Sequence, residues 1–504
     1  MYSPDIKQFR NYAKKGNLVP VYRQMLADTI TPVLAYQKLA SSSHGFLFES
    51  VTGGENIGRY SFLGVDPLGT FVCKGNNATL RMHGKVTKTK TTDPLGELGK
   101  LLSAYRPVKI ANQPGDFSGG AVGYAAYDTV RYVESLPDPP PDTLRVPDLC
   151  FMLCDTVIVF DHVLKTMTII SNAHTGKQSA KKAYDEAVRK IERLVRRLRA
   201  PMAAPINDIT PMGDMTKEFT SNFTREQYHD IVLRAKEYIY AGDIFQVVPS
   251  QRLHTTTTAD SFDIYRALRA VNPSPYMFYL RMGNLKLIGS SPEVMVRVDE
   301  GIVTLRPIAG TRPRGKTEEE DKALAEELLA DPKERAEHIM LLDLGRNDVG
   351  RVCDFNTVKI TEEMIIERYS HVMHIVSNVQ GKLSRGKTSI DALKASLPAG
   401  TLSGAPKVRA MEIIDELEPE RRGPYGGAVG YIDFSRKTLN TGITIRTVVL
   451  KGQDVYLQAG GGVVADSVPE TEYQETLNKA RALLRAIQVA EQCFSSSRPK
   501  RKRE

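Results

Sequence analysis

The chain has 504 residues, more than one hydrophobic core usually supports, so we expect either two interlocked lobes or a large domain with a smaller one. Hydrophobic residues make up 41% of the chain, and no apolar run approaches the roughly 18 residues that span a bilayer, so we expect no membrane association. Much of the net charge of +9 comes from the last seven residues, RPKRKRE; the other 497 carry only +5, too little to predict nucleic-acid binding.

The first 200 residues are expected to form an N-terminal lobe. The opening MYSPDIKQFRNYAKKGN lacks the apolar core of a secretory signal, and the five cysteines include no CxxC pair, so we predict a cytoplasmic protein without a disulfide framework. Strand-like runs follow at 151–162 and 166–170, with Cys150 and Cys154 packed in a strand. Residues 177–200 carry apolar positions at helical spacing. A proline-rich linker over 200–216 then ends the lobe.

A second lobe is predicted over 217–490, followed by a basic, disordered tail over 491–504. It opens with TREQ at 224–227, a capping box that starts a helix running to Gly242. Strand-like runs then accumulate, and their links, such as FSRKT and LKGQD, are too short for parallel crossovers. The predicted class is therefore α+β, built on antiparallel sheets.

Two predicted helices each begin with a pair of carboxylates. Asp331 is a candidate N-cap before Pro332, with Glu334 expected to close a capping box. In the second helix Ser467 is the candidate N-cap and Pro469 the expected start. The pairs are Glu334 with Glu337 and Glu472 with Glu475. Acidic residues in a first turn commonly do no more than complement the helix dipole, but four that converge could hold a hard divalent cation such as Mg²⁺.

Two glycine-rich loops precede helices and are candidate anion sites. One contains Gly460, Gly461 and Gly462, which let backbone N–H groups approach a ligand closely, although a hairpin bend is an equal alternative. The other, LPAGTLSGAPKVRAMEII, spans 397–414. Lys479, one turn after Glu475, suits either a helical ion pair or a substrate contact.

Several long motifs occur in a fixed order along the chain: FLFESVTGGENIGRYSFLG, GSSPE, PIAGT, ERAEHIMLLDLGRND, LPAGTLSGAPKVRAMEII and DSVPETEYQETLNKA. With these motifs the sequence resembles the chorismate-utilising enzymes, and most closely the synthase component of anthranilate synthases, from about residue 20 to residue 490. The resemblance implies an α/β sandwich of two large antiparallel sheets with outer helices.

The resemblance also implies roles for individual residues. By motif, the four glutamates hold Mg²⁺ and, through it, the ring carboxylate of chorismate. Glu293, in GSSPE, falls on the general acid that protonates the leaving C4 hydroxyl, which requires a raised pKa. The remaining pocket positions, including a histidine that would otherwise be assigned to the core, are Tyr425, Arg446, Gly460, Gly461, Gly462, Lys479, Thr401 and His374.

Two positions indicate which nucleophile is added. Family members that add water carry a lysine at the position of Gln246, and those that make 4-amino-4-deoxychorismate typically carry one at the position of Ala309. Ammonia brings its own lone pair and needs neither lysine, so we expect ammonia to attack C2 and pyruvate to leave, giving anthranilate. Gln246 would orient the nitrogen. The alternatives are 4-amino-4-deoxychorismate synthesis and a nucleic-acid-binding scaffold.

The source of ammonia and the regulation of the enzyme complete the expectation. No cysteine lies in the glycine-flanked elbow of a glutamine amidotransferase, so a separate glutaminase subunit is implied, in a hetero-oligomer of two large and two small subunits. Two segments resemble the feedback pocket in which this family binds tryptophan. Its predicted residues are Glu49, Ser50, Pro273, Tyr276 and Met277. The enzyme would then catalyse the first committed step of tryptophan biosynthesis.

Overall fold

The computed structural model describes residues 1–50, 58–111, 113–176, 178–202, 208–209, 216–369 and 372–494. Most of the predicted linker, residues 51–57 of the N-terminal motif and the tail from 495 onward lie outside this part of the chain. Among the described helices, none combines the length and the apolar character that crossing a membrane requires.

The first of two large sheets is antiparallel throughout and has 11 strands. In spatial order they are β1 (Leu18–Leu26), β10 (Thr166–His174), β9 (Thr156–Asp161), β3 (Tyr60–Val65), β2 (His44–Glu49), β14 (Tyr276–Met282), β15 (Leu285–Ser291), β24 (Thr447–Lys451), β25 (Asp454–Gly460), β13 (Ser250–Thr256) and β11 (Thr220–Ser221).

The second sheet has 12 strands and is also antiparallel. Its order is β18 (Ile308–Pro313), β20 (Val372–Lys382), β17 (Ile302–Leu305), β16 (Val294–Asp299), β23 (Leu439–Ile443), β22 (Ala428–Asp433), β7 (Gly120–Ala125), β8 (Leu149–Cys154), β4 (Gly69–Lys74), β5 (Asn77–Met82) and β6 (Lys85–Lys90), with β19 (Lys359–Arg368) also on β20. A separate small ladder joins β12 (Gln246–Val247) to β21 (Gly404–Ala405).

Both large sheets draw strands from both halves of the sequence. In the first sheet β2 pairs with β14, so that Glu49 lies opposite Met277. In the second sheet β7 pairs with β22. The segments 1–200 and 217–490 are therefore interlocked in space, and neither builds a large sheet of its own.

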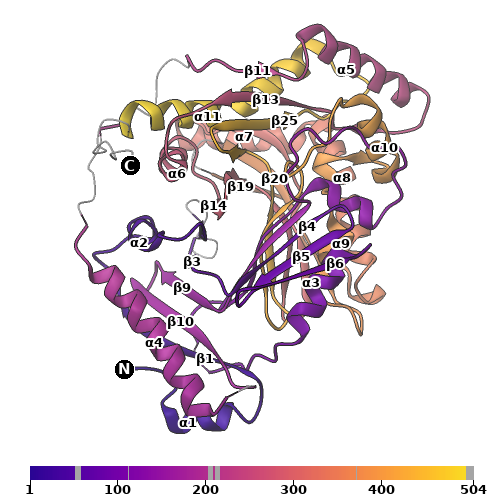
Figure 1. Ribbon diagram of the computed structural model, residues 1–504. Coiled ribbons are helices and arrows are strands. Elements are labelled where there is room, and N and C mark those ends of the chain that lie inside the picture. Colours follow the sequence, from indigo (N-terminus) through magenta and orange to yellow (C-terminus); the bar gives the residue numbers. More distant parts are fainter. Residues whose placement is uncertain are drawn as a thin grey trace.

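The two sheets pack face to face and helices cover their outer faces (Figure 1). The space between the sheets is filled by aromatic and aliphatic side chains such as Phe62, Tyr124 and Phe278. Helices α1 (Ile6–Tyr12), α2 (Pro32–Leu39), α4 (Ala180–Arg199), α6 (Ser261–Val271) and α11 (Pro469–Phe494) pack on the first sheet. Helices α3 (Pro94–Ser103), α8 (Pro332–Gly350) and α9 (Ser389–Ser396) pack on the second.

The remaining helices lie near one end of the sandwich or along its rim. Helices α5 (Arg225–Tyr240) and α10 (Lys407–Leu417) share a small core and lie close together in Figure 1. Helix α7 (Glu318–Ala330) packs against β20. Short 3₁₀ turns are η1 (Tyr127–Tyr132), η2 (Phe355–Thr357) and η3 (Gly400–Leu402). The α+β class and the sandwich of antiparallel sheets are thus confirmed.

Local signals at helix starts are mostly confirmed. The capping box at Thr224 and the N-cap at Asp331 form as predicted. Glu334 departs from the prediction, because its side chain accepts a hydrogen bond from Arg312 at 3.2 Å where a capping box was expected. Helix α11 begins at Pro469, but it continues to residue 494, so residues 491–494 of the predicted tail are helical.

Candidate active site

The two carboxylate pairs come together although α8 and α11 are far apart in sequence. Burial raises the pKa of Glu337, and the carboxylates of Glu334 and Glu475 raise it further. Burial also raises the pKa of Glu472, to which Glu475 adds. Because like charges this close repel each other, the site has an electrostatic demand for a cation.

The carboxylates nevertheless do not form a finished metal site as they stand. Within the described ranges, no three His, Cys, Asp or Glu side chains are arranged to hold a metal ion. Two of the four glutamates are already paired with cationic side chains: Glu334 with Arg312 at 3.2 Å, and Glu475 with Lys479 at 2.7 Å. The donor chemistry fits Mg²⁺, since all four are carboxylates, but two of them are engaged by cationic side chains.

Glu293 lies in the turn between β15 and β16, buried at 9% exposure. Burial raises the pKa of its carboxyl group to about 8. Thr401, in η3, donates a hydrogen bond from its Oγ1 to Oε1 of Glu293 at 3.1 Å, which opposes part of that rise. A carboxyl group with this pKa is protonated at neutral pH and can act as a general acid. A small cavity of about 30 Å³ borders both residues.

Gln246 contacts one of the four glutamates, Glu337. It lies on β12, and its Nε2 donates to Oε1 of Glu337 at 3.5 Å. The run of glycines after β25 leaves room for these side chains, because a Cβ on Gly462 would lie 2.3 Å from Nε2 of Gln246 and one on Gly461 would lie 2.8 Å from Oε2 of Glu472. Any larger residue at either position would displace a predicted site residue.

Lys479 forms the helical ion pair with Glu475 that its position suggested, whereas its substrate contact stays a prediction. Its Nζ donates to the carbonyl of Gly460 at 2.8 Å and pairs with Glu475 at 2.7 Å. It therefore fastens the start of the glycine run to α11. Tyr425, buried at 7% exposure, also borders Gly460, since a Cβ there would lie 3.1 Å from the tyrosine hydroxyl.

Arg446 and His374 are the last two of the predicted pocket residues. Burial lowers the pKa of Arg446, while Tyr425 and Glu475 raise it, so the guanidinium lies among the other predicted residues. Burial and the charge of Arg446 lower the pKa of His374. Nδ1 of His374 is 2.8 Å from the carbonyl of Gly310, in the PIAGT motif. The histidine therefore lies beside Arg446 and the PIAGT motif, and its role in the pocket stays a prediction.

The arginines of LRPIAGTRPRG bind carboxylates of the protein itself. Arg306 pairs with Glu362 and Glu367. Arg314 pairs with Asp321. Arg312 pairs with Glu327 on α7, with Asp331 between α7 and α8, and with Glu334 on α8. No local signal predicts its pairing with Glu334, since the two residues are 22 positions apart on a strand and a helix.

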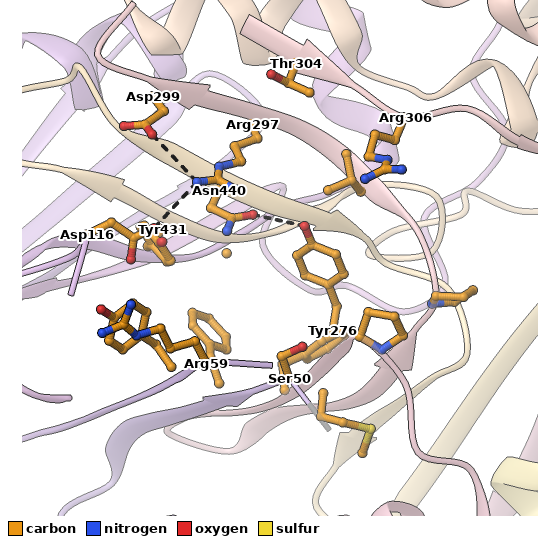
Figure 2. A pocket seen from close by; sticks show the side chains of 18 of the residues that line it. Ser50, Arg59, Asp116, Tyr276, Arg297, Asp299, Thr304, Arg306, Tyr431 and Asn440 are labelled. Carbon is orange, nitrogen blue, oxygen red and sulfur yellow. Dashed lines mark hydrogen bonds and ion pairs between the residues drawn. The ribbon is translucent and has the colours of Figure 1, made fainter. Parts of the chain in front are cut away.

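A much larger cavity of about 780 Å³ is lined by strands of both sheets (Figure 2), and none of the four glutamates of α8 and α11 is among its described lining residues. Four of the predicted feedback residues line it: Glu49, Ser50, Tyr276 and Met277. Pro273 is not among the described lining residues, and Pro275 is. The assignment of Pro273 to a feedback pocket therefore stays a prediction.

Charged groups that the sequence did not single out also line this cavity. Figure 2 shows Arg297 between Asp116 and Asp299, at 3.8 and 3.7 Å, and the hydroxyl of Tyr276 donates to Asn440 at 3.3 Å. Both signs of charge are therefore present, as an amino acid with a carboxylate and an ammonium group requires. Asp299 lies two residues from Arg297 on β16, but Asp116 precedes β7, and Tyr276 and Asn440 lie on β14 and β23, so these contacts depend on the fold.

Comparisons with known proteins agree on one family. Residues 44–485 match the chorismate binding enzyme family. Anthranilate synthase component 1 of Acetivibrio thermocellus is 48% identical over 493 residues, covering 97% of this chain and 99% of that one, and the Pseudomonas aeruginosa protein of the same name is 48% identical over 491 residues, covering 96% and 99%.

Solved structures give the same result. Anthranilate synthase component I from Streptococcus pneumoniae superposes with a TM-score of 0.75 at 38% identity, covering 91% of this chain and 99% of that chain. The menaquinone-specific isochorismate synthase of Escherichia coli, at 18% identity, covers 96% and 98% with a TM-score of 0.68 and shares the fold. The chain belongs to the chorismate binding enzyme family and, within it, to the anthranilate synthase component 1 proteins.

Proposed function

We propose that this chain converts chorismate and ammonia to anthranilate, pyruvate and water. The observation that carries the proposal is the buried Glu293, whose pKa of about 8 provides a protonated carboxyl group at neutral pH. Gln246 and Ala309 support the choice of ammonia, since neither side chain can act as a base or a covalent amine. The relatives named anthranilate synthase component 1 support the product.

The reaction has two stages in one pocket. Glu293 gives its proton to the C4 hydroxyl, which leaves as water while ammonia forms a bond to C2, and the ammonium so formed returns a proton to the carboxylate. The enolpyruvyl group then leaves as pyruvate, taking up a proton at its methylene carbon, and loss of the C2 proton makes the ring aromatic. Gln246, held against Glu337, orients the incoming nitrogen.

Mg²⁺ is the proposed cofactor, with Glu334, Glu337, Glu472 and Glu475 as its residues. The raised pKa values of Glu337 and Glu472 support it, because a cation would offset their burial and the repulsion that Glu475 exerts on both. When bound, Mg²⁺ supplies Lewis-acid assistance and attracts the ring carboxylate. For all four carboxylates to bind the ion, the ion pairs of Glu334 with Arg312 and of Glu475 with Lys479 would have to open.

Ammonia is proposed to come from a separate glutamine amidotransferase subunit. Burial raises the thiol pKa of Cys73 and Cys353 to about 11 and that of Cys150 to about 12, the opposite of what a nucleophilic cysteine needs. The name component 1, which the relatives carry, supports a partner component. We propose a hetero-oligomer of two large and two small subunits, which light scattering of the complex would test.

Tryptophan is proposed as a feedback inhibitor that binds in the large cavity. Ser50 supports this, because its buried Oγ has no hydrogen-bond partner in the described part of the chain and is therefore available to a ligand. Pro292 and Val294, which flank Glu293 in sequence, both line the cavity, so an occupant would touch the turn that carries the general acid.

The test is anthranilate fluorescence from the purified chain with chorismate and ammonium, with and without Mg²⁺. Metal-dependent fluorescence supports the proposal. Consumption of chorismate without fluorescence would instead indicate aminodeoxychorismate or isochorismate, which chromatography of the products distinguishes. Use of glutamine by the chain alone would contradict the separate subunit.

A further inference from the structure

An arginine that no motif singled out lies completely buried behind the pocket. Arg422 is 2% exposed and is the largest of the fully buried side chains. Its Nε and Nη2 donate to the carboxylate of Glu418, at 3.0 and 2.5 Å. Its remaining donors reach two backbone carbonyls: Nη1 that of Leu402 at 2.5 Å, and Nη2 that of Val248 at 2.6 Å. One guanidinium thus joins three separate segments.

Two of these segments, those of Val248 and Leu402, carry a residue of the predicted site. Val248 directly follows the strand that carries Gln246. Leu402 directly follows Thr401, whose hydroxyl binds Glu293. The same guanidinium also lies 5.6 Å from the ring of Tyr425, within the range of a cation–π contact.

Glu418 extends the connection to the strands below the glycine run. Its Oε1 accepts hydrogen bonds from both N and Oγ of Ser250, each at 2.8 Å. Gln458, on β25, donates to the same hydroxyl at 2.8 Å. Ser250 lies opposite Gly460 across the β13–β25 ladder. The ion pair therefore also reaches the backbone that begins the glycine run.

We propose that Arg422 and Glu418 form a positioning unit that holds Gln246, Thr401 and Tyr425 in their relative places. Only a planar fork of donors can serve a carboxylate and two carbonyls in different directions, so a lysine cannot replace this arginine. A buried ion pair is weak evidence for net stability, because desolvation offsets its attraction. The contacts of Arg422 and Glu418 instead support a role in fixing the relative positions of the site residues. The inference rests on the proposed function, since it concerns the same pocket.

The test compares Arg422→Lys and Glu418→Gln with the wild type, using anthranilate formation at fixed concentrations of unprotonated ammonia. Arg131→Lys is the matched control, because Arg131 makes a bidentate pair with Asp415, at 2.7 Å for both bonds. We expect kcat/KM for chorismate to fall about 100-fold in Arg422→Lys, as for a site displaced by about 1 Å. The control should keep the wild-type value.

A second readout separates positioning from a general loss of folded protein. Thr401 lowers the pKa of Glu293, so releasing Thr401 should move the alkaline limb of the pH profile to higher pH. Partial unfolding alone lowers the rate without moving that limb. Melting temperatures of all variants are measured alongside.

The outcomes are distinct. Folded Arg422→Lys and Glu418→Gln with wild-type kcat/KM and an unmoved alkaline limb would overturn the proposal. If Arg422→Lys does not fold, Glu418→Gln decides the question by the same two readouts, and failure of both to fold would assign the pair to folding and overturn its positioning role. A wild type that forms no anthranilate would instead contradict the proposed function.

Discussion

Replacing Glu293 by glutamine should reduce catalysis and increase stability at alkaline pH. The structure raises the pKa of this carboxyl group from 4.5 to about 8. At pH 7 about 90% of the groups are then protonated, against well under 1% for an ordinary glutamate. Glutamine keeps the shape and can still accept the hydrogen bond of Thr401, but it has no acidic proton. General acids typically contribute a factor of about 10² to 10⁴, or roughly 3 to 5 kcal/mol.

Although Glu293→Gln should lower activity, it should raise the free energy of unfolding at alkaline pH. Between pH 4.5 and about 8 the folded state binds more protons at Glu293 than the unfolded state does, so the free energy of unfolding falls as pH rises. Above pH 8 this carboxylate costs up to about 5 kcal/mol, reduced by any relaxation of the site. Glu293→Gln removes that cost, so its melting temperature should exceed that of the wild type at pH 9 and match it near pH 4.5.

The assay is the initial rate of anthranilate fluorescence from pH 6.5 to 9.5 at fixed unprotonated ammonia, with melting curves at each pH. Glu300→Gln is the matched control, because Glu300 is an exposed glutamate in the next turn along the chain, between β16 and β17, and is paired with Lys109. A Glu293→Gln enzyme with more than about a tenth of the wild-type rate would refute the assignment of the general acid. A melting temperature at pH 9 no higher than that of the wild type would refute the buried, raised pKa.

Further predictions concern the nucleophile, the metal and the feedback site. Ala309→Lys should reduce anthranilate formation at least tenfold, because it places an amine at a buried position that otherwise supplies no nucleophile; an unimpaired variant would show that this position does not select the nucleophile. Glu472→Gln should weaken Mg²⁺ binding by about tenfold or more in calorimetry of the chain without chorismate, and unchanged affinity would exclude it as a ligand. Ser50→Phe should fill part of the large cavity and abolish inhibition by millimolar tryptophan at wild-type activity, whereas retained inhibition, or a wild type insensitive to tryptophan, would contradict the site.

The fold could be predicted where its signals are local. The capping box at Thr224 and the N-cap at Asp331 depend on side chains within three residues of the backbone they bind, so the sequence predicts them directly. The sharing of both sheets by the two halves depends on pairings such as Glu49 with Met277, which no periodicity encodes. The length of α11 was underestimated because its last turn continues into residues assigned to the tail.

The site was predicted by motif, and its geometry was not. Glu337 and Glu475 lie 138 positions apart in the sequence, and only the fold brings them close enough to raise a pKa. The ion pair of Glu334 with Arg312 joins a helix to a strand and carries no local signal, whereas that of Glu475 with Lys479 is the i,i+4 pair that the sequence suggested. Arg422 carried no signal at all, because its function depends on backbone carbonyls that any residue supplies.

The central claim is tested most directly by anthranilate fluorescence from the purified chain with chorismate, Mg²⁺ and ammonium at alkaline pH, beside a reaction from which Mg²⁺ is omitted. The chain contains no tryptophan, so its own emission interferes little. The account predicts blue fluorescence that rises with time only when Mg²⁺ is present. Chorismate left unchanged in both reactions would contradict it.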